Sequence, residues 1–497
     1  MEGDVRCGEE GATTTEDRIS GLTDDLLHII LLRLYSTPEA ARTSVLSRRW
    51  RRVWQTLPEL SFFYNDDKSP SPRPSSETVG RRIDQALAAY SAPTVDRLEI
   101  AMPRTGPRFP PAGVAPWLRF ASQRLTGKLR LSMAPNHHAL DKDGEAIVLP
   151  PCSRATAIRL DLHGNTLRFG AGGQASAGAF TALSTLSVEY GRMESRDLED
   201  VVSSGCPSLK KLVLGYVFLC GASDSGLCIR SDSLEHLEIF GDTGLDDDDG
   251  SWLEVDAPKL RFFSPRCSLP KARIVAPMLS EVCWYNYPYN ANLHHLVDVG
   301  RHLRRLDIHT NSPAAELMKL FDTVEDLNLT LDIGKGERQY HTFLKNIDIV
   351  PKCETLLVRF TAREHAFLST MRHLLKNGTS IKKLELFLFL ASTVWPPCLP
   401  CCPCRLPGES VTLDSLEEVE IYFWEGSYEL LHLIELLFNN AVILKKIAIR
   451  YEPSSVLRKE VREKVHRMCH PNIKVEFTVL SCRKRLSYYA SSKLKSL

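Results

Sequence analysis

The sequence lacks the broad signals of a membrane, secreted or nucleic-acid-binding protein. Its 62 Lys and Arg residues are balanced by 61 Asp and Glu residues, for a formal net charge of +1. That balance gives no overall field to attract nucleic acid or an anionic membrane. No stretch approaches the roughly 20 apolar residues that span a bilayer, and residues 1–16 lack the regions of a signal peptide. We therefore expect an intracellular protein, in cytoplasm, nucleus or both, without a nucleic-acid or membrane partner.

Motifs of catalytic and phosphate-binding sites are also missing. The glycines of residues 170–173 lack the Lys-Ser/Thr of a phosphate loop, and neither a Gly-x-Ser-x-Gly elbow nor a His-Glu-x-x-His sequence occurs. The sequence therefore predicts a protein that is not an enzyme, with no catalytic residue and no cofactor. An unrecognised hydrolase or transferase is the alternative, and it would need a clustered nucleophile and base.

Clusters of potential metal ligands are present, but their spacing does not suit a metal site. The four cysteines of residues 398–404 offer one Cys-x-x-Cys without a distant second pair, which favours a Pro/Cys-rich loop over a zinc site. The acidic run at 246–249 lacks the closing glutamate of a calcium loop. The histidine pairs 137–138 and 294–295 are adjacent, so we interpret them as surface or packing residues. We predict no metal, and mostly reduced thiols among the 14 cysteines.

Three helix signals occur within residues 17–62. Thr23 can cap a helix whose leucines and isoleucines recur at helical spacing. Thr37-Pro38 places a proline at the start of a second helix, and Ser47 can open a third. Three short helices bury little surface by themselves, so the outward apolar side chains of the first helix predict a partner surface. The alternatives are a helical cap on the rest of the chain and, for the arginines at 48–52, a nucleic-acid patch. Such charges are more often the solvated side of an amphipathic helix.

This module resembles an F-box of the plant type. The matching residues are Asp17 to Ser20, Leu22 to Leu27, Ile30-Leu31, Arg33-Leu34, Arg42 to Trp50, and Trp54. Thr23 is a departure, because the family usually has proline there. The resemblance implies docking on a Skp1-like protein and, through it, on a cullin and a RING subunit of a ubiquitin ligase. The residues expected to contact the Skp1-like protein are Leu22, Asp25, Leu26, Leu27, Ile29, Ile30, Leu34, Val45, Leu46 and Trp50.

After a Ser/Pro-rich linker, a short apolar pattern recurs along the chain. It reads apolar, two variable, apolar, one variable, apolar, as in Leu209-Leu212-Leu214 and Leu234-Leu237-Ile239. Copies follow one another about every 27 residues, within the period of leucine-rich repeats. One short strand cannot bury its inward face alone, but stacked copies make a continuous core. The asparagine that usually follows the strand in such repeats is mostly missing. The expected fold class is α/β: a three-helix F-box followed by an irregular leucine-rich-repeat solenoid, or horseshoe, with a C-terminal cap.

Residues between the inward positions of each strand are expected to face the concave surface of such an array. Their charges are of mixed sign, which favours a protein ligand over a polyanion. The alternative is that they are only solvated strand residues. The candidate target-binding residues are Lys211, His236, Glu238, Arg305, Asp307, Lys383, Glu385 and Glu420.

The C-terminal region alternates strands and helices. We expect strands at 419–423, 446–450 and 473–477, an apolar helix at 430–438 and a basic helix at 457–468. The region is similar to the FBD region of plant F-box proteins, carried by Leu416 to Ile421, Glu429-Leu430, Asn440-Ala441 and Leu444 to Ile447. The alternative, which we prefer structurally, is that these are the last repeats and a cap over the open end of the array.

The expected organisation has six parts. These are a disordered tail (1–16), the F-box-like module (17–62), a linker (63–79), the repeat array (80–410), the FBD-like region (411–480) and a basic tail (481–497). The sequence thus predicts a substrate-recognition adaptor of an SCF-type ubiquitin ligase, with an unknown protein target. A leucine-rich-repeat scaffold without a link to ubiquitin transfer is the alternative.

Overall fold

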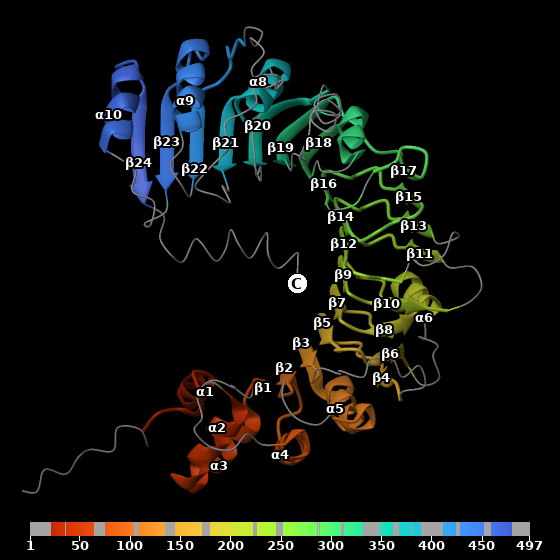
Figure 1. Ribbon diagram of the computed structural model, residues 1–497. Helices are drawn as coiled ribbons and strands as arrows, with labels where there is room; N and C mark the ends of the chain where they lie inside the picture. Colours follow the sequence, from red (N-terminus) through yellow and green to blue (C-terminus); the bar gives the residue numbers. More distant parts are fainter. Residues whose placement is uncertain are drawn as a thin grey trace, which may run out of the picture.

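The protein has a mixed α/β fold in which long, curved layers of parallel strands follow a helical N-terminal module (Figure 1). The computed structural model describes residues 21–34, 36–63, 75–103, 109–134, 145–170, 179–221, 226–244, 252–285, 287, 289–309, 313–331, 347, 349–360, 367–378, 380–388, 411–423, 428–451 and 459–479. The predicted mixture of helices and strands is confirmed. In the described part of the chain, no helix has both the length and the apolar character needed to cross a bilayer.

The N-terminal module contains three short helices joined by single turns of 3₁₀ helix. They are α1 (Asp24–Leu32), α2 (Thr37–Arg42) and α3 (Arg48–Val53), with turns at Thr43–Val45 and Trp54–Thr56. The Thr23 hydroxyl accepts a hydrogen bond from the amide of Leu26 at 3.5 Å, as the capping signal predicts. Ser47 caps α3 in the same way. The second helix begins one residue earlier than predicted: Ser36 is at the N-cap position, and Thr37, the expected cap, is the first helical residue.

One sheet of 16 parallel strands runs along the whole arc, and neighbouring strands follow one another in chain order. The strands that are missing from this series belong to two smaller sheets. The strands of the long sheet are β1 (Glu59–Phe62), β2 (Val95–Ala101), β3 (Leu125–Ser132), β5 (Ala157–Asp161), β7 (Thr185–Glu189), β9 (Lys211–Gly215), β12 (His236–Phe240), β14 (Phe262–Arg266), β16 (Glu281–Trp284), β18 (His302–His309), β19 (Thr323–Leu331), β20 (Lys352–Phe360), β21 (Lys383–Leu388), β22 (Glu418–Phe423), β23 (Lys446–Tyr451) and β24 (Lys474–Val479).

The start of this sheet lies earlier in the chain than the repeat pattern indicates. Strand β1 pairs in parallel with β2, so residues 59–62 belong to the sheet although they fall within the expected helical module. Helix α4 (Ser76–Ala89) begins inside the segment expected to be a linker. Ser75 caps it by accepting from the amide of Thr78 at 3.2 Å. The helical module therefore continues directly into the sheet.

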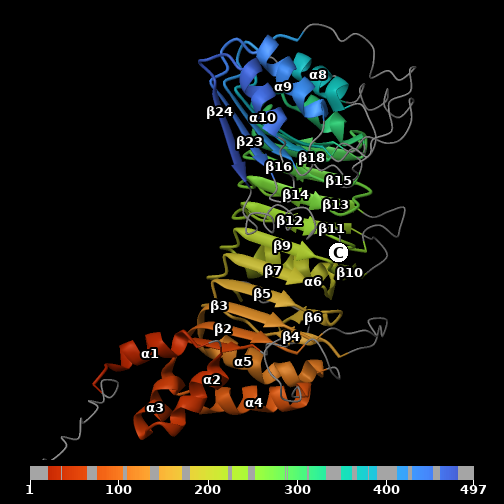
Figure 2. The ribbon, with the colours of Figure 1, turned by 60° about the vertical axis from the view of Figure 1, so that its left-hand side comes forward.

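Further strands and helices cover the outer side of the arc, as Figures 1 and 2 show. One outer sheet has the order β10-β8-β6-β4 and the other β11-β13-β15-β17. Their bounds are β4 (Ile147–Leu149), β6 (Thr166–Phe169), β8 (Arg192–Glu194), β10 (Phe218–Cys220), β11 (Gly226–Arg230), β13 (Trp252–Asp256), β15 (Ala272–Val275) and β17 (His294–Val297). The outer helices and turns include α5 (Ala115–Arg124), α6 (Ser195–Asp200), α8 (Phe367–Asn377), α9 (Tyr428–Asn440), α10 (Lys459–Met468) and the 3₁₀ segment Pro313–Leu320.

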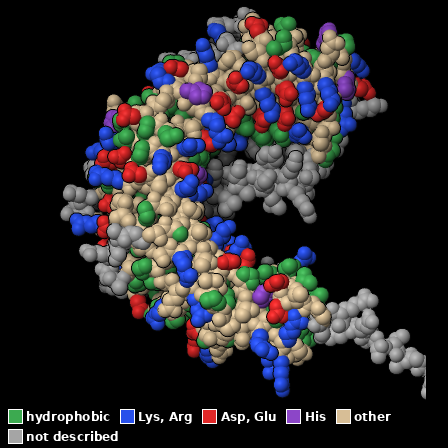
Figure 3. All heavy atoms as spheres, turned by 180° about the vertical axis from the view of Figure 1, so that it is seen from behind, with side chains coloured by type: hydrophobic (Ala, Val, Ile, Leu, Met, Phe, Trp, Pro, Cys, Tyr) green, Lys and Arg blue, Asp and Glu red, His purple; other side chains and the backbone are tan. Residues whose placement is uncertain are grey.

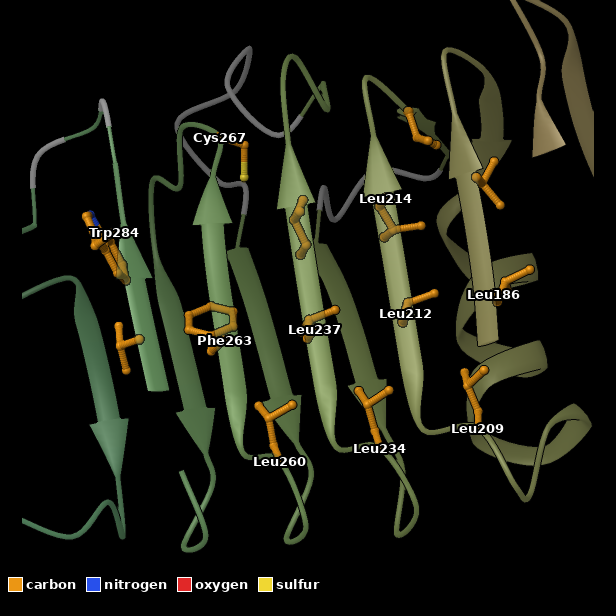
Figure 4. Close-up of a cluster of buried hydrophobic side chains, with 14 of the residues drawn as sticks. Leu186, Leu209, Leu212, Leu214, Leu234, Leu237, Leu260, Phe263, Cys267 and Trp284 are labelled. Carbon is orange, nitrogen blue, oxygen red and sulfur yellow. The ribbon is translucent and has the colours of Figure 1, made fainter. Parts of the chain in front are cut away.

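The core lies between the long sheet and these outer elements. Leu212, Leu237 and Phe263 occupy neighbouring strands in register, and each is fully buried. Figure 4 shows them in a row on one side of the sheet, and Trp284 of the next strand points to the same side. The alternate residues of the same strands face the inside of the arc, and we call this surface the inner face. Stacked strands thus bury a face that one strand could not bury alone.

The C-terminal elements follow the predicted order. The expected strands correspond to β22, β23 and β24, each within two residues of its predicted bounds. The apolar helix is α9 and the basic helix is α10. All three strands extend the long sheet, and β24 is its last strand. This region therefore continues the sheet rather than forming a separate layer.

Candidate functional site

Helix α1 buries one face and exposes another that is equally apolar. Leu27 and Leu31 are 1% and 2% exposed, whereas Leu26 and Ile29 are 46% and 52% exposed. Residues three and four apart lie on the same side of a helix, which sets the exposed group apart from the buried one. Hydrophobic side chains also reach the surface over this module in Figure 3. We call the apolar residues of the module that are more than 40% exposed the docking patch: Leu26, Ile29, Ile30, Val45 and Leu46.

Not every predicted contact residue of the module is available at the surface. Leu27 and Trp50 are buried in the module's own core, which corrects their expected role as partner contacts. Leu22 and Leu34 are half-buried and pack against that core. Asp25 is exposed beside the docking patch residues. The sequence predicted the right helix, but the apolar stripe is wide enough to serve both the core and the surface.

Hydrogen bonds between helices fix the position of α1. The Arg49 guanidinium donates from Nε and Nη2 to Oδ1 of Asp24, at 2.8 and 2.7 Å, and also donates to the Leu22 carbonyl. At the other side of α1, Nε2 of His28 donates to the Val53 carbonyl at 3.1 Å. These contacts tie both the start and the middle of α1 to the α3 segment. The docking patch is therefore presented on a helix whose orientation is set by polar contacts as well as by packing.

The predicted target-binding residues all lie on the strands of the long sheet, and most of them are paired with one another or with a neighbour. The ion pairs within single strands are Arg305–Asp307 at 3.2 Å and Lys383–Glu385 at 2.6 Å. Glu238 pairs with Arg266 of the neighbouring strand, and Glu420 with Arg450. Asp307 is 2% exposed, so a direct contact with a target, as expected from the sequence, does not fit its burial. Lys211 and His236 are partly exposed.

The environment of these inner-face groups shifts their pKa values. Burial, reinforced by the positive charge of Lys211, lowers the pKa of His236 to about 4, so this ring is neutral near pH 7. Burial raises the pKa of Glu420, but hydrogen bonds from Tyr422 and Arg450 outweigh it and hold that pKa below its ordinary value. The hydrogen bond to Glu385 raises the pKa of Lys383. The C-terminal half of the inner face is thus a network of charges that stabilise one another.

Aromatic rings stack from strand to strand along the inner face. Tyr190 and Tyr216 follow β7 and β9 directly, and their ring centroids are 4.9 Å apart. Phe387 and Tyr422 on β21 and β22 are 4.3 Å apart and nearly parallel. Tyr190 and Tyr216 have φ values of 53° and 50°, a region that bulky residues rarely adopt. Tyr190 and Tyr216 thus stack on one another at equivalent positions of neighbouring repeats, directly after their strands.

A group of cations on the first strands of the sheet was not among the predicted residues. Arg97, Lys128, Arg130 and Arg159 lie at inner-face positions of β2, β3 and β5. The signal was present, because Leu129-Leu131 and Ile158-Leu160 marked these strands and the residues between them are basic. The candidate residues began only at β9, so this group was missed.

Metal-site geometry is absent from the described part of the chain, where no group of three His, Cys, Asp or Glu side chains could hold an ion. His294 is buried, with Nε2 donating to the Leu269 carbonyl at 2.7 Å, whereas His295 points to solvent. This separation agrees with the interpretation of the pair as packing and surface residues. The cysteines at 398–404, the acidic run at 246–249, the histidines at 137–138 and the two terminal tails lie outside the described residues.

The fold and surfaces define a class: a mixed α/β protein with exposed apolar side chains on a helical module and charged side chains along a long parallel sheet. No family model matches the chain. Curated proteins of Arabidopsis thaliana do match the chain. An F-box/FBD/LRR-repeat protein of Arabidopsis thaliana is 29% identical over 251 residues, which are 49% of this chain and 54% of the relative. An FBD-associated F-box protein of the same plant is 23% identical over 449 residues, covering 88% and 89%. An F-box/LRR-repeat protein from it is 27% identical, covering 52% and 77%.

The matched segments span about half the length of the first relatives. The chain is similar to plant F-box proteins whose names include leucine-rich repeats and an FBD region, so the resemblance drawn from the sequence is confirmed.

Proposed function

We propose that this protein is the substrate-recognition adaptor of an SCF-type ubiquitin ligase. In this proposal the N-terminal helices form an F-box that docks on a Skp1-like protein, which connects the chain to a cullin and a RING subunit. The parallel strands form a leucine-rich-repeat horseshoe whose inner face binds a protein target. The protein itself does no chemistry; it supplies proximity between the target's lysines and the charged ubiquitin-carrying enzyme.

The observation that carries the proposal is the docking patch on α1. Leu26, Ile29 and Ile30 are each more than 40% exposed, on a helix held by the Arg49 and His28 contacts. An exposed apolar group on a rigid helix face suits a protein partner. The names of the relatives add support, because they include F-box proteins.

The proposed parts keep the expected boundaries. Residues 17–62 are the F-box, 80–410 the repeat array and 411–480 the FBD-like region, with the first strand of the sheet at the end of the F-box segment. Tails at 1–16 and 481–497 complete the chain, and the linker expected at 63–79 ends before α4 begins at Ser76. We place the protein inside the cell, in cytoplasm or nucleus.

A pull-down with a purified Skp1-like protein tests the docking step. Leu26→Asp with Ile30→Asp puts two charges into the docking patch, and we expect binding to fall by more than about tenfold. Met278→Asp with Ile349→Asp is the matched control, since both residues are exposed and apolar but lie on the sheet region. Equal binding by wild type and the docking-patch variant, or no binding by wild type, would contradict the proposal.

The second candidate is a repeat scaffold without ubiquitin transfer. The charges of mixed sign on the inner face are compatible with a protein ligand whether the chain is an adaptor or a scaffold. The two proposals differ in outcome: an adaptor lowers the abundance of its target, whereas a scaffold does not. The half-life of a captured target, measured once with the wild-type protein and once with the docking-patch variant, distinguishes them.

A further inference from the structure

The first strands of the long sheet differ in charge from the rest of the inner face. Arg97 and Lys128 are register neighbours on β2 and β3, and Arg130 and Arg159 are register neighbours on β3 and β5. Adjacent strands lie about 4.8 Å apart. Two pairs of like charges therefore stand side by side on three consecutive strands, an arrangement that is unfavourable by itself. We call these four residues the basic patch.

Few carboxylates neutralise the basic patch. Arg97 pairs with Glu59 at 3.5 Å, and Arg159 with Glu189 at 2.9 Å. Lys128 and Arg130 are exposed, and neither has an ion-pair partner among the described residues. Glu99, the register neighbour of Arg130, has no such partner either. The two central cations of the patch thus remain available to a ligand.

The C-terminal strands show the opposite arrangement. Lys446 and Lys474 are also register neighbours, but Glu476 bridges them at 3.1 and 2.7 Å. Glu385 and Glu420 are neighbours too, and each has its own cation. Acidic and basic side chains alternate over this part of the arc in Figure 3. Like charges are therefore compensated within the chain at one end of the sheet, whereas at the other end Lys128 and Arg130 lack an ion-pair partner among the described residues.

We propose that the basic patch binds an acidic segment of the target protein, with Lys128 and Arg130 as the main contacts. This inference rests on the proposed role of the inner face in target binding. The cations are spread over three strands rather than gathered around one point, which suits successive carboxylates of an extended segment better than one phosphate group. Figure 1 places β2, β3 and β5 at the end of the arc next to the helical module. The acidic segment would be held close to the docking end of the adaptor.

Fluorescence anisotropy of a labelled glutamate-rich peptide with the full-length protein tests the inference. A lysine-rich peptide of equal length is the control ligand, and an oligouridine RNA is the competing class of anion. We expect the acidic peptide to bind, with affinity that falls as salt rises. Lys128→Glu with Arg130→Glu should weaken it on the order of tenfold. Arg230→Glu with Lys259→Glu, two exposed cations outside the inner face, should leave it unchanged.

The outcomes separate this inference from the proposed function. Unchanged peptide binding by Lys128→Glu with Arg130→Glu, or tighter binding of RNA than of the acidic peptide, would overturn the basic patch as an acidic-segment site. Circular dichroism and Skp1 binding of the same variant should match wild type, which shows that the fold is intact. The docking-patch variant should lose Skp1 binding and keep peptide binding, so failure of one site does not mimic failure of the other.

Discussion

Helix α1 exposes leucine and isoleucine side chains that the rest of the described chain does not cover, whereas the inner face of the sheet exposes charges that mostly pair with one another. An uncovered apolar group gains free energy when any complementary protein buries it. A paired charge gains little, because a partner must first replace a contact that already exists. On the proposed function, the helical module would therefore contribute the stronger contact, and the inner face would contribute selectivity.

The largest expected effect contrasts the two faces of α1. Leu27→Ala removes a fully buried side chain, and we expect it to destabilise the N-terminal module by about 2–5 kcal/mol. Ile29→Ala removes an exposed one and should change stability by less than about 0.5 kcal/mol. Urea unfolding followed by tryptophan fluorescence measures both. Equal destabilisation by the two variants would mean that Ile29 is packed against the chain itself and is not available to a partner.

The next effect concerns a partly buried histidine on the inner face. The unfolded His236 has its ordinary pKa of 6.5, and the folded one about 4. As pH falls through this window the unfolded chain takes up a proton that the folded chain does not, so stability decreases. The loss should reach about 2 kcal/mol near pH 5.

His236→Gln should remove that part of the pH dependence. Urea midpoints of wild type and variant, measured near neutral pH and at the lower pH, give the comparison. Parallel pH profiles for the two proteins would show that His236 is not the group responsible.

A smaller effect is expected from the contact that orients α1. Arg49→Ala leaves Asp24 and the Leu22 carbonyl without their donor, and about 1 kcal/mol of stability should be lost after allowance for solvent exposure. Arg81→Ala breaks the exposed Arg81–Glu77 pair on α4 and is the matched control, with about 0.3 kcal/mol. Thermal unfolding distinguishes the two. Comparable losses of stability in the two variants would show that Arg49 contributes no more to holding α1 than an ordinary exposed ion pair does.

The smallest effect belongs to a paired carboxylate. The depressed pKa of Glu420 means that its stabilising contribution is complete above the ordinary value of 4.5 and is lost as pH falls through the lower folded value. Glu420→Gln should therefore be slightly less stable than wild type at neutral pH and converge with it in acid. A difference that grows in acid would contradict the assigned direction.

The sequence predicts the long sheet well because each strand carries its own local pattern. Leu209-Leu212-Leu214 and its copies mark strands that the structure contains, including β2, β3 and β5, where the pattern is weak. The outer strands were missed. Their alternation of buried and exposed residues is as clear, for example Leu227 and Ile229 on β11. The pattern of a short strand, however, does not indicate which sheet the strand joins. Helix α4 was missed because its sequence lies in a segment that composition marks as a linker.

The candidate sites were predicted less completely than the fold. Helical periodicity identified α1 and its apolar residues, but it could not assign Leu27 to the core and Leu26 to the surface, since both lie on one wide stripe. The inner-face positions followed from the strand alternation. Which of their charges are paired depends on neighbours about 27 residues away in sequence, such as Arg450 for Glu420. Only the stacked arrangement reveals that Lys128 and Arg130 of the basic patch have no ion-pair partner among the described residues.

Isothermal titration of the full-length protein with a purified Skp1-like protein, at several temperatures, tests the central claim most directly. Covering the docking patch removes apolar surface from water, so the heat-capacity change of binding should be negative for wild type. Ile29→Ala with Ile30→Ala should weaken binding by at least about tenfold and reduce that change. An unaltered affinity and heat-capacity change in this variant would contradict the account.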